Sequence, residues 1–233
     1  MSLQKLPSPA KAVLFDLDGT LVDANPDLAA AVRAMLAELG EPTRSDAEVG
    51  RFVGKGIGVL VERALNEGRR THDAAECAAA LAVFRRHYAI LNGAQSVVYP
   101  GVVETLRTLN KRGLPCALVT NKAAEFTLPL LKMLGLAEYF QCVVSGDTLP
   151  QSKPAPEPLW HACAQFGVAP EEALMIGDSA NDALAARRAG VPVLLLTGGY
   201  SEGVAVDTLD CDGLISNLAE LIPLLPGHHT TQS

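Results

Sequence analysis

Residues 12–20 read AVLFDLDGT, an apolar run that leads directly into two aspartates and a glycine. The first four residues, AVLF, form a short and wholly apolar segment, which is typical of a buried strand rather than of a helix. Gly19 permits a tight turn immediately afterwards. The stretch therefore predicts a buried strand whose carboxyl end carries Asp16 and Asp18.

The chain from about residue 25 to residue 95 shows helical patterns and no strand candidate. Asn25 and Pro26 are typical of an N-cap followed by proline at the first helical position. Apolar residues then recur at helical spacing in three stripes, namely Leu28, Val32, Met35, Leu36 and Leu39, then Ile57, Leu60, Val61, Ala64 and Leu65, then Leu81, Phe84, Tyr88 and Leu91. A glycine-rich connection, residues 54–56, separates the first stripe from the others. The pattern predicts an all-helical segment.

After residue 100 the pattern changes to a strict alternation of helices and strands. The predicted strands lie in CALVT (116–120), CVVS (142–145), ALMIG (173–177) and VLLLT (193–197), with a helical pattern before each. Alternating β and α segments imply a parallel sheet with helices on both faces. We therefore expect an α/β fold, with a Rossmann-like parallel-sheet core formed by residues 1–23 and 97–233. Residues 24–96 are expected to form a helical cap domain over its active edge.

Residues that can carry chemistry follow four of the predicted strands. In chain order they are Asp16, Asp18, Thr120, Asn121, Lys122, Lys153, Asp178 and Asp182. Because ligands bind at the carboxyl ends of parallel strands, we expect these side chains to converge. Packed carboxylates need a cation, and a few hard oxygen ligands favour Mg²⁺. A carboxylate can act as a nucleophile, and lysine and hydroxyl donors stabilise a transferring phosphoryl group. The pattern favours phosphoryl transfer.

Four segments are similar, in order and spacing, to the motifs of the haloacid dehalogenase superfamily. They are VLFDLDGTLVD (13–23), LVTNK (118–122), SKPAPEP (152–158) and MIGDSANDALAARRAG (175–190), and the resemblance extends from about residue 11 to residue 217. This superfamily places a helical cap between its first and second motifs. Further segments, FVGKGIGVLVERAL, YPGVVETL and SGDTLPQSKPAPEPL, resemble bacterial phosphoglycolate phosphatases more specifically.

The resemblance implies a role for each acidic residue. Asp16 is the nucleophile that forms an aspartyl-phosphate, and Asp18 is the general acid that then acts as a base for the attacking water. Mg²⁺ is held by Asp16, by the backbone carbonyl of Asp18 and by Asp178. Asp182 supports the metal directly or through water.

The resemblance also assigns three of the remaining polar residues. Thr120 and Asn121 bind phosphoryl oxygens, and Lys153 neutralises charge on the phosphate and on Asp16. Lys55, between two cap helices, is a candidate contact for the part of the substrate that is not phosphate. Lys122 is expected to be a surface residue rather than a catalytic one.

The predicted reaction is hydrolysis of a small phosphomonoester, 2-phosphoglycolate being the first candidate. Alternatives are a phosphatase for another sugar phosphate and a phosphomutase resembling β-phosphoglucomutase. Asp18 counts against carbon–halogen cleavage, because a halide leaving group needs no proton. Lys55 keeps a phosphonatase-type Schiff base open, and a non-catalytic binding module fits least.

Composition limits the remaining classes of protein. The net charge of −7 and the pI near 5.2 argue against a nucleic-acid partner, and no apolar run is long enough to span a membrane. Five cysteines without a CxxC pair suggest a reducing cytoplasm, where the chain is expected to be a monomer or a homodimer. His87 and His161 are expected to be structural or solvated, Trp160 to be a packing residue, and the histidine pair 228–229 to lie in a frayed tail.

Overall fold

Six parallel strands form the central sheet in the computed structural model, which describes residues 10–67 and 71–225. The strand order is β5-β4-β1-β6-β7-β8. The strands are β1 (Ala12–Phe15), β4 (Cys116–Val119), β5 (Cys142–Val144), β6 (Ala173–Gly177), β7 (Val193–Leu196) and β8 (Gly213–Ile215). Strand β1 pairs with β4 on one side and β6 on the other, so the strand order reverses there. The predicted α/β fold with a parallel sheet is confirmed.

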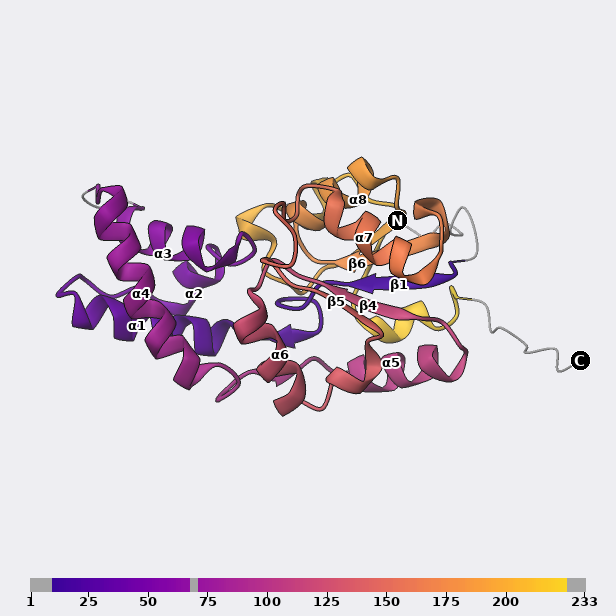
Figure 1. The fold of residues 1–233 in the computed structure, drawn as a ribbon, viewed down its shortest axis with the longest axis horizontal. Coiled ribbons are helices and arrows are strands. Elements are labelled where there is room, and N and C mark those ends of the chain that lie inside the picture. The colour runs from indigo at the N-terminus through magenta and orange to yellow at the C-terminus, as the bar shows by residue number, and fades with distance from the viewer. Residues whose placement is uncertain (1–9, 68–70, 226–233) are drawn as a thin grey trace, which may run out of the picture.

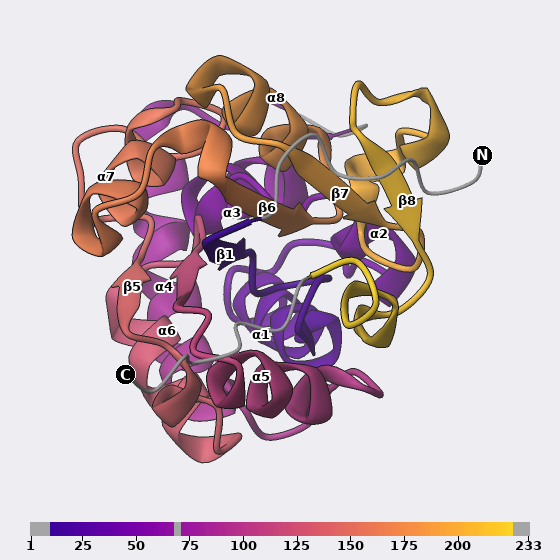
Figure 2. The same cartoon turned by 90° about the vertical axis from the view of Figure 1, so that its right-hand side faces the viewer.

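Helices cover both faces of this sheet, as Figures 1 and 2 show. Helices α5 (Val102–Lys111) and α6 (Ala124–Met133) lie on one face, and α7 (Glu157–Phe166) and α8 (Ala180–Ala189) lie on the other. Successive side chains of a strand point to opposite faces. Val13 and Phe15 therefore belong to the apolar cluster under α5 and α6, whereas Leu14 belongs to the cluster under α7 and α8.

Four helices form the insertion that follows β1, at the left of Figure 1. They are α1 (Asn25–Glu38), α2 (Asp46–Gly50), α3 (Gly56–Asn66) and α4 (Ala74–Leu91). The described part of residues 25–95 contains helices and no strand, as predicted, although the short helix α2 was not expected. The apolar faces of α1, α3 and α4 belong to the same buried cluster as the face of the sheet that α5 and α6 cover. The carboxyl ends of the strands point toward this insertion.

Two short strands connect the insertion to the sheet. Strand β2 (Val22–Asp23) pairs antiparallel with β3 (Val97–Val98), and Asp23 is the register partner of Val97. The buried carboxylate of Asp27 accepts backbone hydrogen bonds from Gly93, Gln95 and Ser96 at 2.8–3.0 Å. The outgoing and returning connections are therefore fixed to each other.

Five 3₁₀ helices complete the described elements: Ala137–Tyr139, Pro170–Glu172, Ser201–Gly203, Val206–Thr208 and Leu218–Leu221. No helix in residues 10–67 and 71–225 combines the length and the apolar character that crossing a membrane requires. The five cysteines are all free thiols.

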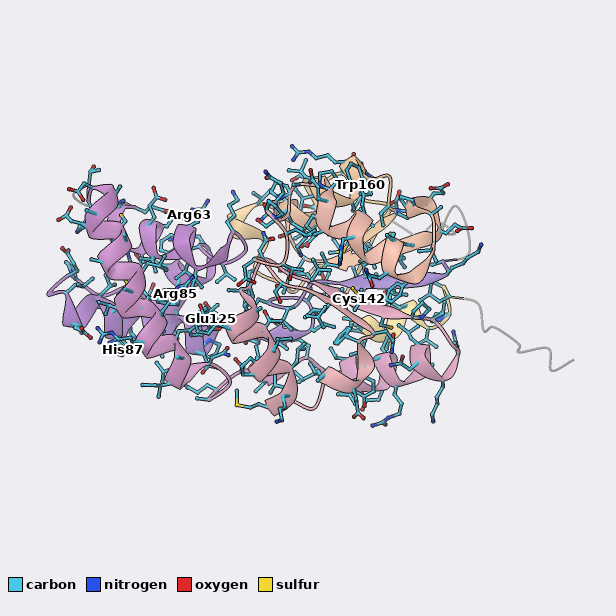
Figure 3. All side chains as sticks on the ribbon, in the orientation of Figure 1. Arg63, Arg85, His87, Glu125, Cys142 and Trp160 are labelled. Atoms are coloured by element: carbon cyan, nitrogen blue, oxygen red, sulfur yellow. The ribbon has the colours of Figure 1, made fainter. Side chains whose placement is uncertain are left out.

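Two local predictions are wrong. Ala24, rather than Asn25, is the N-cap of α1, and its side chain offers no cap hydrogen bond. Trp160 is 45% exposed on α7, where its indole N–H donates to the Ala189 carbonyl at 3.1 Å (Figure 3). His87 is structural as expected, because its ring nitrogen bonds Glu38 at 2.8 Å. The histidine pair 228–229 lies outside the described residues.

Candidate active site

Three carboxylates and one lysine meet at the carboxyl ends of β1 and β6. Asp16 follows β1 and Asp178 follows β6, so the pairing of these neighbouring strands brings the two residues together. Asp182, in the first turn of α8, completes a cluster in which one oxygen from each carboxylate lies within 4.8 Å of the others. The Lys153 ammonium bridges Asp16 at 2.8 Å and Asp182 at 2.6 Å. Lys153 is only 3% exposed.

The cluster carries more negative charge than its one lysine neutralises. Burial raises the pKa of Asp16 to about 6, with Lys153 lowering it and Asp182 raising it further. Burial also raises the pKa of Asp178 well above its ordinary value, as do the carboxylates of Asp182 and Asp16. Burial disfavours the charged form of Lys153, but its two carboxylate partners raise its pKa overall. Hard oxygen ligands with an excess of negative charge fit a divalent cation such as Mg²⁺.

Hydrogen bonds hold Asp178 in a fixed orientation. The Thr20 hydroxyl donates to one oxygen at 2.8 Å, and the backbone N–H of Tyr200 donates to the other at 2.7 Å. Asp182 accepts from the Ser179 hydroxyl at 2.7 Å in addition to its bond with Lys153. Asp182 therefore organises the turn after β6 as well as the lysine.

Glycines allow the backbone to approach these carboxylates closely. A Cβ atom at Gly199 would lie 2.2 Å from an oxygen of Asp178, and one at Gly19 would lie 2.3 Å from the same atom. A Cβ atom at Gly177 would lie 2.3 Å from the Asp182 carboxyl carbon. These separations exclude any side chain at the three positions, because the atoms they would meet are fixed by hydrogen bonds.

The prediction for Lys122 is wrong. This lysine is 5% exposed, and its ammonium donates to both oxygens of Asp18 at 3.1 Å and to the Tyr88 hydroxyl at 2.6 Å. Burial opposes its charge, but the Asp18 carboxylate raises the pKa of Lys122 overall. Lysine is exposed in most proteins, and the sequence alone does not show which side chain of the segment 120–122 turns inward.

Thr120 and Asn121 lie where the sequence predicted, at the carboxyl end of β4. Thr120 is buried, and its hydroxyl accepts from the backbone N–H of Lys122 at 3.2 Å. The Asn121 amide nitrogen donates to the Gly54 carbonyl at 2.9 Å and to the Lys153 carbonyl at 2.8 Å. Asn121 thus links the glycine-rich loop of the insertion to the segment that carries the active-site lysine.

A cavity lies between the sheet and the insertion. Its lining is polar on the sheet side and mainly apolar on the insertion side: Asp16, Asp18, Thr120, Asn121 and Lys122 face Leu28, Val53, Gly54, Gly56, Ile57 and Leu60. Lys55 is exposed at the N-terminus of α3 and is not among these lining residues. The structure therefore brings together the eight candidates that follow the strands, and Lys55 lies apart from them at the start of α3.

Sequence reasoning missed three groups that bond to the site. Tyr88 fell on an apolar helical stripe and was interpreted as a core residue, and nothing in the spacing reveals that its hydroxyl meets Lys122. Thr20 and the backbone N–H of Tyr200 bond Asp178, which is far from both in the sequence, so no local pattern indicates these contacts.

Comparison with known proteins gives consistent matches. A family model described as haloacid dehalogenase-like hydrolase matches residues 10–190. The phosphoglycolate phosphatase of Thiobacillus denitrificans is 48% identical, over 94% of this chain and 96% of that protein. Phosphoglycolate phosphatase 1 of Pseudomonas aeruginosa is 46% identical, over 91% of this chain and 79% of that protein. The crystal structure of a predicted phosphoglycolate phosphatase from Haemophilus somnus superposes with a TM-score of 0.89 at 32% identity, covering 94% of this chain and 99% of that one.

Proposed function

Because the chain belongs to the haloacid dehalogenase-like hydrolase family, we propose that it hydrolyses 2-phosphoglycolate to glycolate and phosphate through an aspartyl-phosphate on Asp16. The substrate is proposed from the names of the similar phosphatases. One observation carries the chemistry: Asp16 lies at a strand end, with its carboxylate 2.8 Å from a buried lysine and beside two further carboxylates. This arrangement suits a carboxylate that attacks a dianionic phosphate.

In the proposed mechanism the phosphoryl group moves twice. The Asp16 carboxylate attacks phosphorus and forms a new P–O bond while the P–O bond to glycolate breaks. Asp18 gives its proton to the departing oxygen, and then accepts a proton from the water that attacks the aspartyl-phosphate. That attack releases phosphate and regenerates both carboxyl groups. Thr120, Lys153 and the backbone N–H of Asn121 hold the phosphoryl oxygens during both transfers, since the Asn121 side-chain amide donates to the Gly54 and Lys153 carbonyls.

Asp16, Asp178 and the backbone carbonyl of Asp18 are the proposed ligands of Mg²⁺, and Asp182 is the proposed indirect support. When bound, the ion neutralises charge on the phosphoryl group and on the nucleophile. The bonds that Asp182 makes to Lys153 and Ser179 favour the indirect role, because through them Asp182 orients the lysine beside Asp16 and the turn that follows Asp178.

We further propose that residues 24–96 act as a cap domain over a core of residues 1–23 and 97–233. Support comes from the cavity between the two parts and from the Asn121 bond to Gly54. An ion pair at 2.9 Å between Arg85 of α4 and Glu125 of α6, labelled in Figure 3, also joins them. The free thiols suit a cytoplasmic enzyme.

We expect the purified protein to release glycolate and inorganic phosphate from 2-phosphoglycolate in Mg²⁺, and to release neither in excess EDTA. Added Mg²⁺ should restore turnover, whereas Ca²⁺ should not, because it prefers more ligands at longer distances. Phosphate release and product analysis measure both outcomes. A parallel assay with a sugar phosphate tests the alternative: isomerisation of that sugar phosphate, without free phosphate from either compound, would identify a phosphomutase. Full activity in chelator would contradict the proposed metal.

Lys55 provides a test of how the substrate is selected. We propose that its ammonium meets the substrate carboxylate, since it follows Gly54 in the loop that Asn121 holds. Lys55→Ala should lower kcat/KM for phosphoglycolate at least about tenfold, roughly 1.4 kcal/mol, and leave p-nitrophenyl phosphate little changed. Equal losses on both esters would point to a weakened cap, and no loss on either would contradict a substrate contact.

A further inference from the structure

Asp18 has a buried cationic partner that the proposed reaction does not use. The Lys122 ammonium lies 3.1 Å from each oxygen of the Asp18 carboxylate. One ammonium bound to both oxygens restrains the position of that carboxyl group from one side. Asp18 is itself only partly buried, so without this partner its side chain would be free to rotate within the cavity.

A residue of the insertion binds Lys122 in turn. The Tyr88 hydroxyl, on α4, accepts a hydrogen bond from the ammonium at 2.6 Å. The Tyr88 ring is fully buried, stacked on Phe84 at 5.3 Å between centroids and packed on Phe126 at 4.8 Å. Phe126 belongs to α6, on the sheet side, so this ring is clamped between the two parts of the molecule.

We propose that Lys122, held by Tyr88, is a positioning residue that aims the Asp18 carboxyl at the leaving-group oxygen, so that proton transfer depends on the seating of the helical insertion. The inference rests on the proposed function, in which Asp18 is the acid. Asp18 acts in its protonated form, in which one oxygen carries the proton and the other accepts from Lys122, and this proton moves to the substrate oxygen as the P–O bond breaks. Lys122 keeps all of its protons and exchanges none.

A competing role for Lys122 is direct contact with substrate, because it also lines the cavity. Two esters of nearly the same shape separate the roles. Phenyl phosphate has a basic leaving group that needs a proton, whereas p-nitrophenyl phosphate has one that leaves as the anion. Neither carries a carboxylate, and kcat/KM reports only the steps up to departure of the phenol.

The experiment measures kcat/KM for both esters in Lys122→Met and Tyr88→Phe. Tyr88→Phe keeps the packed ring and removes only the hydroxyl. Lys132→Met, on the exposed side of α6, and Tyr139→Phe, in the 3₁₀ helix after α6, are the matched controls. Thermal unfolding establishes that each variant is folded at the assay temperature.

We expect Lys122→Met to lose at least about tenfold on phenyl phosphate and less than about threefold on p-nitrophenyl phosphate. Tyr88→Phe should show the same asymmetry with a smaller loss, and the controls should show none. Equal losses on the two esters, as a phosphate contact or a damaged fold would give, or no loss at all, would overturn the proposal.

Asp18→Asn in the same assay keeps the inference separate from its premise. If Asp18→Asn loses far more on phenyl phosphate and the Lys122 and Tyr88 variants do not, the positioning role is wrong and the acid role stands. If Asp18→Asn shows no such preference, the proposed acid itself is wrong.

Discussion

Replacing Asp16 with asparagine is expected to reduce phosphate release from 2-phosphoglycolate by at least about a thousandfold. An amide cannot attack phosphorus as a carboxylate does, and Asp18, the other carboxylate that follows β1, is paired with the Lys122 ammonium. Single-turnover assays should also show neither consumption of the substrate nor an acid-stable phosphoenzyme, because no aspartyl-phosphate forms. Asp207→Asn, which removes an exposed carboxylate outside the cluster of Asp16, Asp178 and Asp182, should retain full activity.

The same substitution should leave the fold intact. The pKa of Asp16 in the folded protein, about 6, lies above its ordinary value of 3.8. Its ionisation therefore opposes folding, and the cost develops as the pH rises from about 4 to 6 and is fully present at pH 7. In chelator at pH 7, Asp16→Asn should thus unfold at the same temperature as the wild type or at a higher one. Retention of more than about a tenth of the activity would rule out Asp16 as the nucleophile.

Lys153→Met is expected to affect both stability and turnover. The substitution removes the only cation within hydrogen-bonding reach of Asp16 and Asp182 among the described residues, and breaking such a buried pair costs about 3–5 kcal/mol. Phosphate release should fall at least about a hundredfold, because a phosphoryl-oxygen donor is lost as well. Urea unfolding in chelator measures the first effect, and the Mg²⁺ assay measures the second.

The control for this variant is Lys132→Met, which removes an exposed helix lysine and should change the free energy of unfolding by less than about 0.5 kcal/mol. Lower pH should partly restore the stability of Lys153→Met, since the Asp16 carboxylate, whose pKa burial already raises to about 6, can then be protonated. A variant as stable as the wild type at pH 7 would mean that the Asp16 carboxylate was already neutral there.

Long elements and strand ends could be predicted from the sequence. The strand at 12–15 and the strands of the alternating segments after residue 100 are apolar, buried and bounded by glycine or polar residues. Their patterns therefore predict most strands of the central sheet. Once the strands are parallel, Asp16 and Asp178 must share an edge. Strands β2 and β3 were missed because two residues give no periodicity to detect, and β8 was missed because its sequence, GLI, contains only two apolar residues after a glycine.

Side-chain direction at single positions could not be predicted. The predictions for Lys122 and Trp160 are wrong because they follow the average burial of lysine and tryptophan. The actual burial of each residue depends on its partner, which is the Asp18 carboxylate for Lys122 and the Ala189 carbonyl at the end of α8 for Trp160. Asn25 is not the N-cap because it is already the first residue of α1, so Ala24 occupies the N-cap position. These details depend on tertiary contacts that a single sequence does not encode locally.

The pairing of β2 with β3 makes the insertion exchangeable. The chain leaves the sheet side at Asp23 and returns at Val97, and since these are register partners, the two ends of the insert lie about 5 Å apart. Any segment whose ends meet at that spacing, from a tight turn to a whole domain, fits there without displacing a strand of the central sheet. Evolution can therefore replace the insertion while keeping the sheet and the carboxylates at its edge, and each replacement must provide a partner for Lys122 in place of the Tyr88 hydroxyl or do without one.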